Sequence, residues 1–166
     1  KGEMSMAIIA TRIDSRLIHG QVANLWTTKL NISRIMVIND AVAQNDIEKQ
    51  GLKLACPPGE KLSILPIDKA ANNIKEGKYD TQRLLIVARR PENFLRLVEY
   101  GVSLPEHNVG NMSQTPETRS VTRSINVVDK DIADFDALAA KGVKLFAQMV
   151  PGDSPKDFML LLDKVR

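Results

Sequence analysis

Residues 6–30 read MAIIATRIDSRLIHGQVANLWTTKL, and this stretch decides the fold. The apolar run at 6–13 predicts a buried strand, and apolar side chains at helical spacing over 21–30 predict an amphipathic helix. A segment at 14–20 that contains Asp14, Ser15, Arg16 and His19 separates the two elements. We expect the buried face of the helix to carry Val22, Leu25 and Trp26. A strand, a short loop and a helix together form the first unit of an α/β fold.

The rest of the chain repeats this alternation. Further strands are expected at 34–38, 61–65, 83–88, 107–109, 121–127 and 143–150, and helices at 46–55, 68–75, 91–100, 131–141 and 155–165. Asp46 is expected to cap the first of these helices. Strands that alternate with helices pair in parallel through right-handed crossovers. We therefore expect an open three-layer α/β/α fold with a mostly parallel central sheet of about six to seven strands.

Composition limits the class of protein. The chain has 166 residues, of which 43% are hydrophobic and 26% charged, and this fits one globular domain over 6–166 with a leader at 1–5. The net charge of +3 is too small to indicate nucleic-acid binding. No apolar run approaches the roughly 18 residues of a membrane span. Cys56, the single cysteine, excludes an intramolecular disulfide and a cysteine-based zinc cluster, and favours a reducing, cytosolic setting.

Ligands of open α/β sheets bind beyond the carboxyl ends of the strands. The segments expected there are 11–20, 39–40, 89–90 and 110–123. Among them, Arg89, Arg90, Arg119 and Arg123 are either solvated charges or groups that face an anion or a partner, and the sequence does not decide between these. We interpret His107, in a short apolar strand, as structural.

The loop after the first strand carries the densest set of reactive groups. Histidine is neutral and nucleophilic near pH 7, so His19 can attack phosphorus and carry a phosphoryl group. Arg12 and Arg16 are suited to stabilising the added negative charge. Asp14 could orient either the imidazole or an arginine, and as a simple turn residue it would have no catalytic role.

Two residues at the start of the expected helix support an anion site. Gly20 allows backbone N–H groups to approach a phosphate, and a helix that begins near Gln21 directs the positive end of its dipole towards it. The glycine-rich phosphate loops and the common zinc-protease and serine-hydrolase motifs are missing from the sequence. The phosphoryl group would therefore arrive on another molecule.

The segment RIDSRLIHGQV at 12–22 resembles the active-site loop of the IIB components of the mannose/sorbose class of the bacterial phosphoenolpyruvate-dependent sugar phosphotransferase system (PTS). The resemblance extends to VIND at 37–40, VGNM at 109–112 and KGV at 141–143, and so covers nearly the whole chain. Ser15 departs from the pattern, because the family has a second aspartate there.

The resemblance implies a phosphocarrier enzyme. His19 matches the phosphoacceptor, which in this family uses Nδ1, and Arg16 matches the arginine that contacts the phosphoryl group. Arg12, Asp14, Gly20 and Gln21 match supporting positions of the family's loop, and Ser15 is expected to support the phosphate site in place of the family's second aspartate. The expected donor is a phosphohistidine on a separate IIA protein, and the acceptor is a sugar that enters through the membrane components IIC and IID. The protein is then expected in the cytoplasm, held peripherally at the inner face of the membrane, without a metal or cofactor.

Some properties stay open at this point. The sugar lies in the mannose, fructose, sorbose and N-acetylgalactosamine range, and we favour an amino sugar although no residue identifies it. The oligomeric state is not readable, and a homodimer is one option. A receiver-type signalling domain phosphorylated on Asp40 is an alternative function, and it predicts magnesium dependence. A non-enzymatic anion-binding module is another.

Overall fold

The computed structural model describes residues 7–104 and 106–166, and the expected leader at 1–5 lies outside them. The first half contains β1 (Ile8–Asp14), α1 (Gly20–Leu30), β2 (Arg34–Ile38), the 3-10 turn η1 (Val42–Gln44), α2 (Asp46–Ala55), β3 (Lys61–Leu65) and α3 (Ile67–Lys75). The second half contains β4 (Leu84–Ala88), α4 (Pro91–Glu99), β5 (Glu106–Asn111), β6 (Arg119–Ser120), β7 (Asn126–Val127), α5 (Asp129–Ala140), β8 (Lys144–Ala147), β9 (Lys156–Asp157) and α6 (Phe158–Asp163).

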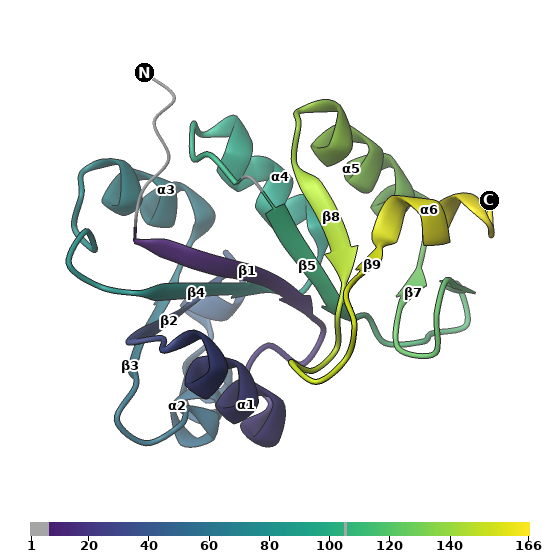
Figure 1. The fold of residues 1–166 in the computed structure, drawn as a ribbon. Coiled ribbons are helices and arrows are strands. Elements are labelled where there is room, and N and C mark those ends of the chain that lie inside the picture. The colour runs from purple at the N-terminus through teal and green to yellow at the C-terminus, as the bar shows by residue number, and fades with distance from the viewer. Residues whose placement is uncertain (1–6, 105) are drawn as a thin grey trace.

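A seven-stranded sheet in the order β3-β2-β4-β1-β5-β8-β9 forms the middle layer. All of its pairings are parallel except that of β9 with β8. The central strand β4 is buried along its whole length, as a strand covered by helices on both faces must be. The expected three-layer, mostly parallel architecture is confirmed (Figure 1).

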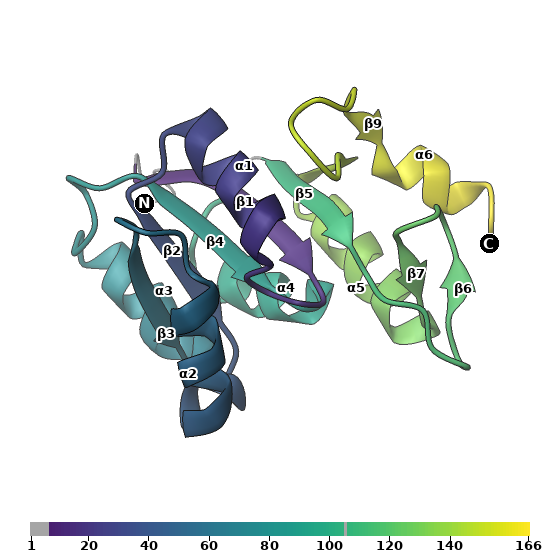
Figure 2. The same cartoon turned by 90° about the horizontal axis from the view of Figure 1, so that it is seen from below.

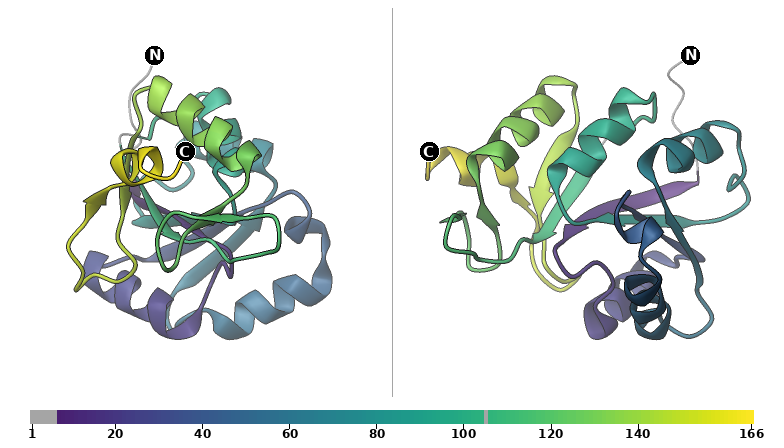
Figure 3. Two further views of the ribbon diagram at one scale, coloured as in Figure 1. Left: turned by 90° about the vertical axis from the view of Figure 1, so that its right-hand side faces the viewer. Right: turned by 180° about the vertical axis from the view of Figure 1, so that it is seen from behind.

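Side chains of the strands alternate between two cores. Ile35 and Val37 of β2 join α1 and α2 in one cluster, whereas Met36 and Ile38 join α3, α4, α5 and α6 in the other. The two helical layers are seen on opposite sides of the sheet in Figure 3. Because the strands are parallel, their carboxyl ends share one edge, where loop residues from distant parts of the sequence meet.

Several expected boundaries were wrong. The segment 121–127 is not one strand, because β6 and β7 form a short antiparallel hairpin. The strand expected at 143–150 ends at Ala147, and the helix expected at 155–165 begins only after the edge strand β9. Asn45, rather than Asp46, caps α2 by accepting a hydrogen bond from the Glu48 backbone. Leu25 does not lie on the buried face of α1, since its side chain is 44% exposed.

His107 is a structural residue, as expected. It is buried in β5 with its ring 4.1 Å from that of Phe94, and its Nδ1 lies 2.7 Å from the Thr11 hydroxyl oxygen. Burial lowers the pKa of this imidazole to about 3, against the opposing effect of Thr11. The described helices include none that is long and apolar enough to cross a membrane.

His107 makes folding sensitive to acid. Below its ordinary pKa near 6.5 the unfolded chain binds a proton that the folded chain does not bind until about pH 3. As the pH is lowered from about 6.5 to about 3, the free energy of unfolding should therefore decrease, by up to about 1.4 kcal/mol per pH unit from this group. His107→Gln should lose that increment of slope in urea unfolding measured from pH 7 to pH 4. Parallel curves for the two proteins would show that His107 does not cause the sensitivity.

Candidate functional site

The loop between β1 and α1 is held in a fixed shape by its two apolar residues. Leu17 and Ile18 are buried in the core under α1. Leu17 has φ 61°, in the left-handed region that a leucine rarely adopts, and its N–H donates to the Asp14 carbonyl. The turn therefore buries Leu17 and Ile18 and leaves Arg16 exposed and His19 half-buried at the carboxyl edge of the sheet.

His19 occupies the N-cap position of α1. Its side chain does not cap the helix, and its carbonyl accepts from the Ala23 N–H. The Nδ1 atom is buried and has no hydrogen-bond partner among the described residues. Gly20, the first helical residue, is exposed, with nothing within 4 Å of where a Cβ would stand. Gln21 lies in the first turn, but its side chain is outside the described part of the structure.

Asp14 orients arginines rather than the imidazole in the contacts that the structure describes. Its carboxylate accepts from the Arg16 backbone N–H at 2.9 Å and lies 3.7 Å from Arg16 Nε. The other carboxylate oxygen is 3.4 Å from Arg12 Nη2. The side chain of Arg16 is 40% exposed, so it can turn towards a ligand at the loop while the hydrogen bond to Asp14 holds its backbone in place.

Arg12 is buried beneath the loop and does not face solvent. Its Nη1 donates to the Gln148 carbonyl at 3.1 Å, and its guanidinium lies 5.7 Å from the ring centre of Trp26. Burial lowers the pKa of Arg12, and the carboxylate of Asp14 opposes that shift. The guanidinium also lies against Gly110, where a Cβ would collide with it. Arg12 therefore supports the loop from below.

Gly110 and Gln148 are partners of the loop that sequence analysis did not identify. Gln148 also pairs with Asn108, whose side chain donates to the Gln148 carbonyl and accepts from its N–H. The sequence signals were the nearness of both segments to expected strand ends and, for Gly110, its place in the VGNM segment that carries the family resemblance. Nothing in a single sequence links Gly110 to Arg12, because the clash depends on how β1 and β5 lie side by side.

Ser15 joins the loop to the end of β5. Its N–H donates to the Asn111 carbonyl, and its hydroxyl accepts from the Ser113 N–H at 2.9 Å. Arg89 Nε donates to the Ser15 carbonyl, while another nitrogen of Arg89 pairs with Glu48 at 3.1 Å. Ser15 and Arg89 thus hold the loop main chain in place.

The other edge arginines separate into two groups. Arg90 pairs with Asp131 at 3.2 Å, and Arg119 pairs with Asp129 at 3.1 Å, so both are engaged with the segment that begins α5. Arg123 is exposed and makes no hydrogen bond or ion pair in the described part of the chain.

Asp40 does not have the surroundings of a phosphoacceptor carboxylate. One oxygen accepts from the Ile67 N–H and the other pairs with Arg96 at 2.9 Å, so Asp40 links α3 to α4. The hydrogen bond from Ile67 and then that from Arg96 lower its pKa, against the effect of burial. No group of three or more His, Cys, Asp or Glu side chains within 7–104 and 106–166 is placed to hold a metal ion. The receiver-type alternative loses support because both carboxylate oxygens of Asp40 are engaged by Ile67 and Arg96.

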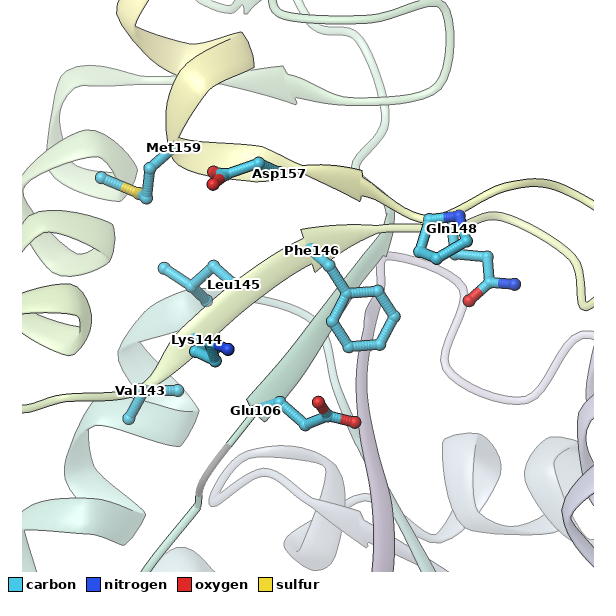
Figure 4. A pocket seen from close by; sticks show the side chains of 9 residues that line it. Glu106, Val143, Lys144, Leu145, Phe146, Gln148, Asp157 and Met159 are labelled. Atoms are coloured by element: carbon cyan, nitrogen blue, oxygen red, sulfur yellow. The ribbon is translucent and has the colours of Figure 1, made fainter.

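A hollow of about 520 Å³ lies on the outer strands, away from His19. Figure 4 shows Glu106, Lys144 and Phe146 around it, with Gln148 at the end nearest the loop. Its lining contains none of the predicted site residues. The predicted site residues therefore lie in the β1–α1 loop and not in this hollow.

Comparisons with known proteins identify the family of the chain. Residues 8–166 match the family described as "PTS system sorbose subfamily IIB component". The chain is 36% identical over 160 residues to the mannose-specific EIIAB component of Escherichia coli (strain K12), covering 96% of this chain and 50% of that protein. It is 32% identical to the fructose-specific EIIB component of Bacillus subtilis (strain 168), covering 96% of this chain and 98% of that one.

A solved structure extends the likeness to three dimensions. The IIBSor domain of the sorbose permease from Klebsiella pneumoniae superposes with a TM-score of 0.92 at 30% identity, covering 97% of this chain and 99% of that one. The chain spans about half the length of the mannose-specific EIIAB relatives that it matches.

Replacing Gly110 tests the support beneath the loop. Gly110→Ala should displace the Arg12 guanidinium from its buried position and lower the free energy of unfolding by about 1–3 kcal/mol. Gly51→Ala is the matched control, because a Cβ there meets nothing within 4 Å in helix α2, so it should stabilise by about 0.5–1 kcal/mol. Urea unfolding measures both changes. Equal stability of Gly110→Ala and wild type would contradict the tight packing of Arg12.

Proposed function

The chain belongs to the sorbose subfamily of PTS IIB components, and from that premise we propose that His19 receives a phosphoryl group from a phosphohistidine of a separate IIA protein and passes it to a sugar. In the first step a P–N bond forms to His19 as the donor's P–N bond breaks, and the electron pair of that bond stays on the donor's imidazole. In the second step a sugar hydroxyl forms the P–O bond, the P–N bond to His19 breaks, and the hydroxyl proton passes to the released imidazole.

The observation that carries the proposal is a histidine without a structural function. His19 neither caps α1 nor makes a hydrogen bond through its buried Nδ1 within the described part of the chain. A buried nitrogen without a partner has a cost in folding free energy. His107 has the same cost at Nε2, but its Nδ1 lies 2.7 Å from the Thr11 hydroxyl oxygen, a structural contact that His19 lacks in the described part of the chain. The cost is expected at a nucleophile whose partner arrives only during reaction.

Positive groups of the loop supply the stabilisation that phosphoryl transfer needs. Its transition state is loose and carries charge on the peripheral oxygens, so fixed donors account for most of the catalysis. Arg16 is an exposed cation three residues before His19 in the loop, and the first turn of α1 adds N–H groups and the positive end of the helix dipole. Arg12, Asp14 and Ser15 act by holding these donors in position.

The family's use of Nδ1 has a geometric consequence here. Nδ1 of His19 points inward, so an incoming phosphorus cannot reach it in this orientation. The χ2 torsion of histidine is soft and roughly two-fold, so the ring can turn and move Nδ1 away from its buried position. We propose that this turn precedes transfer through Nδ1.

The proposed location, the membrane partners and the sugar rest on membership of the same family. We propose that the protein works in the cytoplasm and meets the membrane through IIC and IID. The sugar belongs to the mannose, fructose, sorbose and N-acetylgalactosamine range, because relatives named for different sugars resemble this chain to a similar degree. The proposal requires no metal or cofactor.

Removing the nucleophile tests the proposal. His19→Gln should accept no phosphoryl group from phosphorylated IIA while its circular dichroism and melting temperature stay near those of the wild type. The chain has two histidines, so His107→Gln is the matched control, and it should remain a substrate if it folds. Intact mass after incubation with the donor measures the adduct. An adduct on His19→Gln of the same yield as on wild type would refute the assignment.

Arg16 should affect rate rather than folding. Arg16→Ala should slow phosphoryl acceptance on the order of 10²-fold, the usual loss when one preorganised donor is removed from a developing charge. Arg123→Ala removes an exposed arginine outside the loop and should leave the rate within about two-fold of wild type. Rapid-quench kinetics with phosphorylated IIA measure both. An unaltered rate for Arg16→Ala would exclude Arg16 from the site.

A further inference from the structure

A second, mostly apolar hollow lies beside α1. It has a volume of about 500 Å³ and lies between the outer face of the helix and the connection from β8 to β9. Its lining consists of Asn24, Leu25, Thr28, Lys29, Val150, Pro151 and Gly152. Figure 2 shows this connection running alongside α1.

The wall opposite the helix is fixed by hydrogen bonds. Trp26 Nε1 donates to the Met149 carbonyl at 3.0 Å, and the Asp153 N–H donates to the Val150 carbonyl at 3.0 Å. The side chain of Gln148 closes the connection by donating to the Asp153 carbonyl at 2.8 Å. The hollow is therefore preformed, and a partner entering it has little ordering cost.

The hollow lies within reach of any protein that docks on His19. Leu25 is six residues along α1 from His19, or roughly 9 Å at 1.5 Å per residue. A standard protein interface covers about 800 Å² on each partner, equivalent to a disc of roughly 16 Å radius. A protein that brings its own histidine to His19, and whose interface extends along α1, covers Leu25 and the hollow as well.

The charge of the surface indicates the chemistry of that partner. The sequence of α1 contains no acidic residue, Lys29 lines the hollow, and Arg16 is exposed at the loop. A complementary surface has an apolar side chain to fill the hollow and carboxylates to meet the two cations.

We infer that the hollow between α1 and the β8–β9 connection is the docking socket for the phosphodonor protein, and that it receives an apolar side chain flanked by acidic residues. Leu25 and Val150 form its apolar walls, and Lys29 and Arg16 contribute charge. This inference rests on the proposed function, because it assumes that a protein delivers the phosphoryl group to His19.

Leu25→Asp tests the socket by placing a carboxylate where the apolar contact is expected. We expect the KM for phosphorylated mannose-class IIA to rise by at least about 10-fold, the cost of losing a central apolar contact, with kcat within about two-fold. Lys29→Glu should raise KM at low ionic strength, and salt should diminish that effect. Leu160→Asp is the matched control: Leu160 is 61% exposed on α6, which lies at the other end of the molecule from α1 (Figures 1 and 2).

A small phosphodonor separates docking from chemistry. Phosphoramidate can phosphorylate a histidine without any protein, so the Leu25→Asp and wild-type chains should react with it at equal rates. If both chains accept phosphate from phosphoramidate and have the same KM for IIA, the socket is wrong while the proposed function stands. If the wild type forms no adduct on His19 with either donor, the proposed function itself fails. An equal rise of KM for Leu160→Asp would also overturn the socket.

Discussion

The buried guanidinium of Arg12 is the constraint on which the functional edge depends. A buried positive charge is unstable unless nearby groups compensate for its lost hydration. The guanidinium of Arg12 contacts the carboxylate of Asp14, the carbonyl of Gln148 and the face of Trp26. These contacts join β1, the connection after β8 and helix α1. Gly110 completes the arrangement, since any side chain there would collide with the guanidinium. One residue thereby joins β1 and α1, which are neighbours in the sequence, to β5 and to the connection after β8, which are distant from them.

The division of roles in the loop follows from this support. Leu17 and Ile18 are buried below, and Asp14 and Ser15 take the hydrogen bonds that fix the main chain. Such an arrangement leaves His19 and Arg16 as the residues free to meet another molecule. Phosphoryl transfer between two histidines suits this design, because it needs positioned charge more than it needs a deep pocket.

Sequence reasoning found the fold because strands and helices of four or more residues carry a readable period. It failed for β6, β7 and β9, which have two residues each and are too short to show any period. It identified the β1–α1 loop from the density of charged groups, yet could not distinguish the buried Arg12 from the exposed Arg16. That difference is set by Gly110 and Gln148, which are far away in the chain. Leu25 was assigned to the core face of α1 from spacing alone. In the structure it is partly exposed and lines a hollow next to the β8–β9 connection, and the spacing within α1 carries no information about that connection.

The central claim is that His19 carries the phosphoryl group, and locating that group within the chain tests it most directly. The protein would be incubated with phosphoenolpyruvate, enzyme I, HPr and a mannose-class IIA, digested under alkaline conditions and sequenced by tandem mass spectrometry. The account predicts one acid-labile phosphoryl group, on His19. A phosphoryl group on Asp40 or His107, or none at all with a cognate IIA, would contradict it.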